Sequence, residues 1–296
     1  MSGAGEPMRV ALLGVSGMFG SMAYRLMSER PSLTVFGTAR SGETRRFFEE
    51  PLRTNIVTGV DAENPDALAG TLRDLRPDLV VNCIGVVKQL ASAKDPLVAI
   101  PVNSVLPHRL ARFCDLLGSR LIHISTDCVF SGRRGNYRES DPPDAEDLYG
   151  RTKLLGEVDY PNAVTLRTSI IGRELSTRNG LVEWFLNERG AVKGFSKAIF
   201  SGLTTDELAR VMLEFVFNRP ALRGTYHVSA EPIDKYRLLN IVKEVYEAAT
   251  EIVLDQEVTI DRSLDSSRFR NTTGYRPPTW PEMIKRMRGF ELANGS

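Results

Sequence analysis

The chain has 296 residues, of which 42% are hydrophobic and 25% are charged, and its formal net charge is +1. This length suits one large α/β domain, or a large domain with a smaller lobe. The balanced charge argues against nucleic acid or a membrane surface as a partner. No apolar run approaches the ~18 residues of a membrane-spanning helix, and segment 1–7 lacks the apolar core of a signal peptide.

Cysteine and histidine are too sparse for a disulfide framework or a metal site. The three cysteines, Cys83, Cys114 and Cys128, show no paired spacing, and the three histidines lie far apart in the sequence. We therefore expect a protein of the reducing cytoplasm without a bound metal.

The first half of the chain alternates short apolar runs with segments of helical periodicity. This alternation predicts a doubly wound parallel sheet of the Rossmann type, covered by helices on both faces. Strands are expected at 8–13, 33–38, 55–60, 78–84, 121–125 and 163–168. Helices are expected at 21–29, 65–75, 97–117 (interrupted near Pro101 or Pro107) and 149–159.

The regular alternation of predicted strands and helices ends after about residue 172, which indicates a smaller C-terminal α+β substrate lobe. Residues 8–172 are thus predicted as the dinucleotide-binding domain and 173–296 as mostly substrate-binding, with the helix near 204–218 returning to the first domain. Helices are expected at 181–188, 205–217 and 236–249, a strand at 225–229, and mixed loops and short helices over 261–287.

A glycine-rich segment follows the first predicted strand, with Gly14, Gly17 and Gly20 spaced three apart. Glycines at a strand-to-helix turn let the backbone approach a pyrophosphate, and the helix N-terminus favours its charge. A turn needed only for packing is the alternative. The predicted cofactor contacts here are Gly14, Ser16, Gly17, Met18, Phe19 and Gly20.

The end of the second strand bears on the choice of nicotinamide cofactor. NAD sites usually carry a carboxylate there, whereas this chain has Arg40 and Ser41, which suit a 2′-phosphate. NADPH is therefore favoured as the cofactor, and NADH remains open. The alternative for Arg40 is an ordinary surface arginine without a ligand. Asp61, after the third strand, is placed to meet the adenine or to remain an exposed loop carboxylate.

Tyr149 and Lys153 lie four residues apart on a predicted helix, so that both side chains reach one point. A nearby cation favours the phenolate and would lower the pKa of the tyrosine. A lone pair at this spacing also occurs by chance on solvated helices. The interpretation of the Tyr149/Lys153 pair therefore depends on two other segments. These are the glycine segment after the first predicted strand and residues 125–127 at the end of the fifth.

Together these motifs resemble the extended short-chain dehydrogenase/reductase family, most closely its dTDP-4-dehydrorhamnose reductase branch. The likeness rests on the glycine segment, Ser125-Thr126-Asp127, the Tyr149-x-x-x-Lys153 pair and the C-terminal run 262–269. It implies that Tyr149 is the general acid, that Lys153 holds the nicotinamide ribose, and that Thr126 polarises the substrate carbonyl. The backbone of Cys83, Ile84 and Gly85 is then expected beside the cofactor.

The residue after Thr126-Asp127 separates related activities. Dehydratases of this family have glutamate where this chain has Cys128, and a thiol is a poor general acid. Segments 86–89 and 194–204 also depart from the reductase branch and are expected to line the sugar pocket. Candidate substrate contacts are Thr126, Asp127, Cys128, Lys88, Lys197 and Arg262, the last three being equally compatible with plain surface cations.

The leading hypothesis is an NADPH-dependent reductase of a nucleotide-diphospho-4-keto-(6-deoxy) sugar, serving deoxysugar or surface-polysaccharide synthesis. A sugar-nucleotide epimerase that retains NAD is one alternative. A non-catalytic dinucleotide-binding subunit, like the regulatory β subunit of methionine adenosyltransferase, is the other. The family resemblance also implies that a homodimer is an option, and the sequence names neither the nucleotide nor the sugar.

Overall fold

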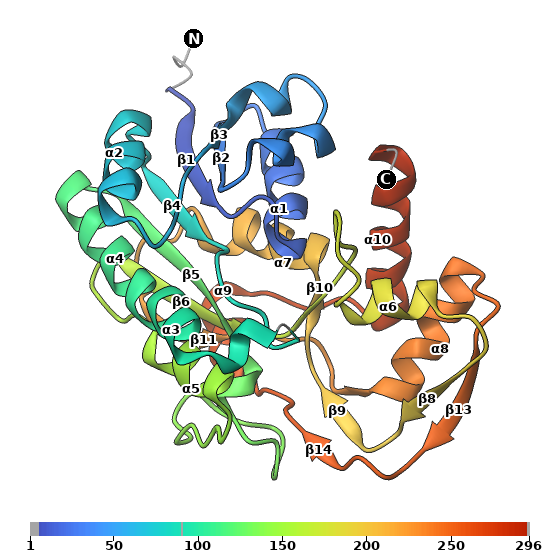
Figure 1. The fold of residues 1–296 in the computed structure, drawn as a ribbon. Helices are drawn as coiled ribbons and strands as arrows, with labels where there is room; N and C mark the ends of the chain where they lie inside the picture. Colours follow the sequence, from blue (N-terminus) through green and yellow to red (C-terminus); the bar gives the residue numbers. More distant parts are fainter. Residues whose placement is uncertain (1–5, 90, 295–296) are drawn as a thin grey trace.

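The fold is built on a seven-stranded, wholly parallel sheet (Figure 1). The computed structural model describes residues 6–89 and 91–294. The strands are β1 (Met8–Leu13), β2 (Leu33–Ala39), β3 (Ile56–Thr58), β4 (Leu79–Asn82), β5 (Arg120–Thr126), β6 (Ala163–Thr168) and β11 (Gly224–His227). Their order is β11-β6-β5-β4-β1-β2-β3. This arrangement confirms the predicted doubly wound sheet.

Helices cover both faces of the sheet because successive side chains of a buried strand point to opposite sides. In β1, Val10 and Leu12 belong to one hydrophobic cluster, whereas Ala11 and Leu13 belong to another. The first cluster includes α1 (Met18–Ser28) and α7 (Thr205–Val211); the second includes α2 (Pro65–Leu75) and α4 (Leu106–Leu117). No helix in the described ranges is long and apolar enough to cross a membrane.

The predicted interruption of the long helix near Pro101 is present. Residues 96–117 form α3 (Pro96–Ala99), a π-helical stretch (Ile100–Val105) and α4. Pro101 has no N–H to donate, and such π turns often occur at functional sites. The π stretch buries Asn103, whose amide connects the segment after β4 to the helix α5 (Leu148–Leu155).

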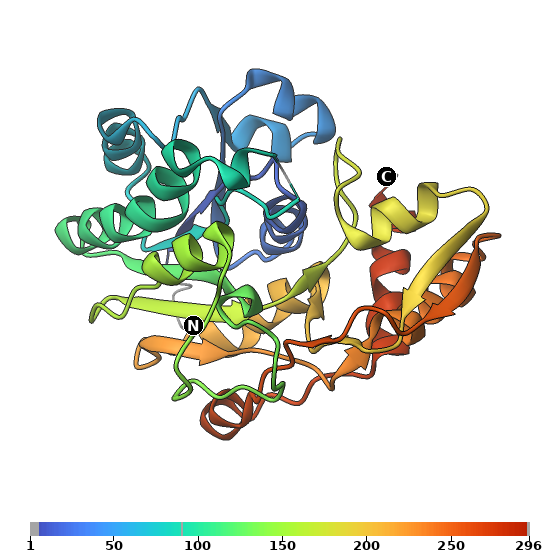
Figure 2. The same cartoon turned by 60° about the horizontal axis from the view of Figure 1, so that its bottom comes forward.

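The second lobe is a set of small sheets and helices beside the large sheet (Figures 1 and 2). Most of its strands have two to five residues, too short to give a clear periodicity. The strand pairs are β7 (Ile170–Ile171) with β10 (Leu203–Thr204), and β8 (Ala191–Phe195) with β13 (Glu251–Asp255); β9 (Ala198–Phe200) lies between β12 (Ile233–Asp234) and β14 (Ile260–Asp261). The helices are α6 (Leu181–Asn187), α8 (Lys235–Tyr246), α9 (Ser267–Thr273) and α10 (Trp280–Asn294).

Residues after 172 contribute to both lobes. Helix α7 packs against α1, as expected for a helix that returns to the first domain. Strand β11, whose residues were assigned to the second lobe, instead pairs with β6 and completes the large sheet. One hydrophobic cluster extends from β1 to Met283 and Ile284 of α10, so the two lobes share a core.

Candidate active site

A pocket of about 470 Å³ lies between the sheet and the second lobe. Its first wall combines the glycine segment after β1, Gly85 after β4, and Asp127 and Cys128 after β5. Ligands of open α/β sheets bind at the carboxyl ends of the strands, and this volume is typical of a small-molecule site. The second lobe supplies the opposite wall.

The glycine segment leaves room for a phosphate at one position and is packed tightly at two others. Gly14 has φ +90°, and a Cβ on Gly20 would lie 2.1 Å from the Gly14 carbonyl oxygen. A Cβ on Gly17 would meet nothing closer than 3.5 Å, and Ser16, Gly17 and Met18 line the pocket where α1 begins. This open backbone at a helix N-terminus fits a dinucleotide pyrophosphate. The Phe19 side chain is buried in the core instead.

The residues predicted to select the cofactor lie together at the ends of β2 and β3, where Gly59 N donates to the Arg40 carbonyl at 3.2 Å. The Arg40 side chain is exposed, with no partner among the described residues. The Ser41 hydroxyl accepts a hydrogen bond from Glu43 N at 3.2 Å, and an Asp61 carboxylate oxygen accepts one from Glu63 N at 3.0 Å. Of these three side chains, Arg40 is the one without a hydrogen-bonding partner in the described ranges.

The segment after β4 forms part of the first wall of the pocket and lies near Lys153. Cys83 N donates to the Leu13 carbonyl at 3.1 Å, and Ile84 N donates to Asn82 Oδ1 at 3.1 Å. Gly85 follows and lines the pocket, and a Cβ there would lie 3.4 Å from Asn103 Oδ1 and 3.8 Å from Lys153 Nζ. The Lys153 ammonium therefore lies close to Gly85, behind the pocket lining.

Lys153 is buried, with 6% of its surface exposed. Its Nζ donates to the Ile124 carbonyl at 2.8 Å. Burial lowers the pKa of Lys153 to about 8, against the opposing effects of Glu157 and Cys83. The ammonium thus gives up its proton more readily than that of an exposed lysine.

Tyr149 lies one helical turn before Lys153 on α5, which the Asp147 carboxylate caps by accepting Gly150 N at 2.7 Å. Burial raises the pKa of Tyr149, and the nearby Cys128 adds to the rise. This direction is opposite to the predicted lowering by Lys153, because desolvation of the phenol dominates. The phenol is therefore protonated at neutral pH, as a proton donor must be.

Thr126, Asp127 and Cys128 form the turn after β5. The Thr126 hydroxyl donates to Asp127 Oδ1 at 3.2 Å and accepts Cys128 N at 3.1 Å, so it caps this turn. Burial raises the pKa of Asp127, against the effect of Arg262, and burial raises the pKa of Cys128 to about 12. The thiol therefore stays protonated, which agrees with the argument against elimination chemistry.

The three predicted cationic substrate contacts have different environments. Arg262 lines the pocket and donates through Nε to the Phe130 carbonyl at 2.9 Å. Lys88 forms an ion pair with Asp147 at 2.5 Å and does not reach the pocket wall. Lys197 is exposed at the turn between β8 and β9, also off this wall. Thr126, Tyr149 and Lys153 do not line this pocket either, and substrate contacts by Lys88 and Lys197 stay predictions.

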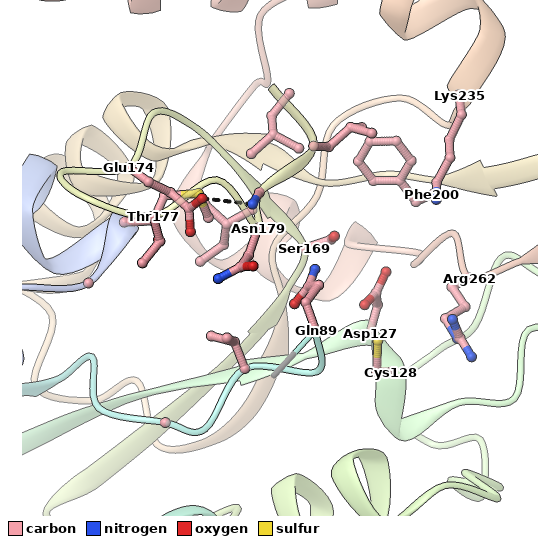
Figure 3. A pocket seen from close by; sticks show the side chains of 18 of the residues that line it. Gln89, Asp127, Cys128, Ser169, Glu174, Thr177, Asn179, Phe200, Lys235 and Arg262 are labelled. Carbon is pink, nitrogen blue, oxygen red and sulfur yellow. Dashed lines mark hydrogen bonds between the residues drawn. The ribbon is translucent and has the colours of Figure 1, made fainter. Parts of the chain in front are cut away.

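The segments that depart from the reductase branch do border the pocket, through Val87, Gln89 and residues 198–200. Many other lining residues were not predicted, among them Lys235 and Glu174. Lys235 begins α8, and Glu174 accepts Gly180 N at 2.8 Å, which closes a loop over the pocket (Figure 3). Neither carried a sequence signal, because a strand of two residues precedes Lys235 and irregular chain surrounds Glu174. No cluster of potential metal ligands occurs among the described residues.

A family model described as "RmlD substrate binding domain" matches residues 8–288. The chain belongs to this family. This RmlD-family chain is 31% identical over 229 residues to a "Probable low-salt glycan biosynthesis reductase" of Haloferax volcanii, covering 74% of the chain and 73% of the relative. It is 28% identical over 251 residues to the Danio rerio "Methionine adenosyltransferase 2 subunit beta", covering 80% and 74%.

The RmlD-family fold also recurs in a dTDP-4-dehydrorhamnose reductase from Bacillus anthracis, solved in complex with NADP. The TM-score is 0.78 at 20% identity, and the match covers 96% of this chain and 99% of the other. At this identity the likeness supports the fold. Family membership places the chain among NAD(P)-dependent oxidoreductases of the extended short-chain type.

Proposed function

We propose that this protein is an NADPH-dependent reductase of a nucleotide-diphospho-4-keto sugar. The observation that carries the proposal is the convergence of Gly17, Gly85 and the Asp127 turn on one pocket, with Lys153 directly behind Gly85. The reductases among the relatives and structural neighbours support the same reaction class. Their names concern sugar nucleotides and glycan synthesis, which indicates the substrate class.

The residues of the site divide the work between binding and proton transfer. NADPH would supply the hydride, with its pyrophosphate at Gly17 and its adenosine 2′-phosphate at Arg40. Lys153 would hold the nicotinamide ribose hydroxyls near Gly85. As hydride reaches the keto carbon, the protonated Tyr149 phenol would give its proton to the developing alkoxide oxygen. The Thr126 hydroxyl, already at the turn, would orient the carbonyl.

A regulatory role is the second candidate, because the Danio rerio relative is a subunit of methionine adenosyltransferase. The geometry of the pocket is compatible with a binding function alone. Such a protein would bind NADPH and a partner enzyme without turning over any keto sugar. An epimerase, in contrast, would co-purify with NAD and leave added NADPH unoxidised.

The proposed function is tested by following NADPH oxidation with a panel of enzymatically prepared 4-keto sugar nucleotides. We expect at least one substrate to be reduced, and Tyr149→Phe to lower kcat about 10²–10⁴-fold. The NADPH Kd of the variant should remain within about twofold of the wild type, since only the hydroxyl is removed. Full activity of the variant would exclude Tyr149 as the proton donor, and wild-type inactivity on the whole panel would favour the regulatory role.

A further inference from the structure

A loop of irregular chain, residues 174–180 between β7 and α6, lines the pocket beside the glycine segment (Figure 3). A Cβ on Gly180 would lie 3.5 Å from Sδ of Met18, the first residue of α1. Residues 176–179 are exposed, so the loop buries little apolar surface of its own. Its position therefore depends on how its two ends are held.

Arg173, directly before this loop, joins the two ends of the loop and attaches them to the C-terminal helix. Its Nε and Nη2 donate to the two carboxylate oxygens of Glu183, which lies in the first turn of α6 directly after the loop. Its Nη1 donates to Oε2 of Glu291 on α10 at 2.9 Å. The Arg173 side chain is 32% exposed, whereas those of Glu183 and Glu291 are 11% and 7% exposed. The base of the loop is thus closed by largely buried ion pairs.

Both carboxylates are themselves held by neighbouring side chains. Glu183 Oε1 accepts Asn187 Nδ2 at 3.1 Å, and Glu291 Oε1 accepts the Tyr246 hydroxyl at 2.6 Å. Fixed carboxylates give the planar guanidinium of Arg173 one favoured orientation. Buried ion pairs are costly to desolvate, and apolar side chains of similar volume often stabilise a fold as well. What the cluster supplies is therefore a defined position for Arg173 and for the loop that starts beside it.

We propose that Arg173 is a positioning residue for dinucleotide binding, because it holds loop 174–180 against the start of α1, where the pyrophosphate would bind. This inference rests on the proposed function, which assigns the pyrophosphate to Gly17. Arg173 does not line the pocket, so its effect reaches the ligand through the loop. A loop held beside the ligand must move before the ligand leaves, and loss of the ion pairs should therefore speed dissociation.

The first test measures NADPH binding by fluorescence titration and stopped-flow mixing. We expect Arg173→Met to raise the Kd about tenfold, mainly through faster dissociation, with the association rate within about twofold of the wild type. Arg173→Lys keeps the charge and should recover part of the affinity. Glu291→Gln keeps the side-chain shape and is the milder second variant, which should raise the Kd in the same direction.

Arg210 offers a matched control for the loss of a largely buried ion pair. Its side chain is also 32% exposed, and it pairs with Glu207 and Glu214 without lining the pocket. Arg210→Met should lower the Tm about as much as Arg173→Met does and leave the Kd and the dissociation rate of NADPH unchanged. Equal losses of NADPH affinity in the two variants overturn the proposal, because general destabilisation would then explain both.

Limited trypsin digestion reports on the loop itself, because Arg178 is exposed in its middle. Without ligand, Arg173→Met should be cut after Arg178 several-fold faster than the wild type, since the open form of the loop becomes more populated. Cutting after the exposed Arg223, outside the loop, should not change. A wild-type cutting rate at Arg178 together with a wild-type Kd for NADPH overturns the proposal, and so does an equal acceleration at Arg178 and Arg223.

These outcomes are distinguishable from failure of the proposed function. If the wild type reduces a keto sugar nucleotide while Arg173→Met keeps the NADPH affinity and the cutting rate, the positioning role fails and the reductase stands. If no keto sugar is reduced but Arg173→Met loses NADPH affinity and is cut faster after Arg178, the positioning role stands and the reductase fails.

Discussion

Arg40 directly follows β2 and has an exposed side chain with no partner among the described residues. We predict that Arg40→Ala weakens NADPH binding about tenfold or more and leaves NADH binding nearly unchanged, because only the former has a 2′-phosphate to pair. Fluorescence titration with both cofactors measures this. Arg223→Ala, an exposed arginine at the start of β11, is the control. Equal losses for the two cofactors would contradict the NADPH assignment.

Lys153 provides a pH prediction because burial lowers its pKa to about 8 from the usual value of 10.5. Between about pH 8 and 10.5 the unfolded chain keeps the proton that the folded protein has lost. Stability therefore gains from Lys153 as pH rises through this window, and the burial penalty is fully present below it. The free-energy difference between the wild type and Lys153→Met should shift in favour of the wild type from pH 7.5 to 9.5. A constant difference would contradict the lowered pKa.

At the residue scale, sequence reasoning located the residues that backbone geometry constrains. Gly14 and Gly20 are needed for close packing, and the four-residue spacing of Tyr149 and Lys153 follows from the helix. Sequence reasoning could not decide which of the lysines in the second lobe line the pocket. Lys197 and Lys235 both lie in the second lobe, and only the register of short strands decides that Lys235 enters the pocket.

Among the elements, β6 and the segment after α5 are joined by a buried ion pair. Arg167 donates through Nε and Nη2 to the two Glu157 carboxylate oxygens at 2.7 and 2.6 Å, and the side chains are only 6% and 8% exposed. Glu157 Oε1 also accepts the Ser125 hydroxyl at 2.7 Å, one residue before Thr126. The pair thus holds the end of α5 against strand β5.

We predict that Arg167→Met lowers the free energy of unfolding by ~3–5 kcal/mol, because it removes the guanidinium that donates to both oxygens of the buried Glu157 carboxylate. Urea unfolding measures the loss. Arg73→Met, which breaks the exposed Arg73–Asp74 pair, should cost at most ~1 kcal/mol. Similar losses in the two variants would show that the Arg167 pair does not behave as a buried one.

The elements of the large sheet could be predicted because long apolar strands and capped helices leave clear patterns. Helix α2 has the predicted bounds, 65–75, since Asn64 caps its start. The second lobe could not be predicted in the same way. Its strands β9, β12 and β14 have two or three residues each, and their pairing depends on the surrounding tertiary structure.

For the whole molecule, the position of the pocket follows from how the lobes are joined. The sheet supplies the glycine segment and the catalytic turn, the second lobe supplies Lys235 and Arg262, and a shared hydrophobic cluster connects the two. The site is therefore assembled across the chain rather than within one segment. Strand β11, which the sequence pattern placed in the second lobe, completes the sheet.

Transfer of deuterium from NADPH to the sugar tests the central claim most directly. The protein would be given a 4-keto sugar nucleotide with NADPH deuterated at either face of the nicotinamide C4, and the product examined by mass spectrometry and NMR. We predict that one of the two labels appears on the former keto carbon, and that Tyr149→Phe slows the transfer about 10²–10⁴-fold without moving the label. A sugar product without deuterium from either cofactor would contradict the proposed reduction.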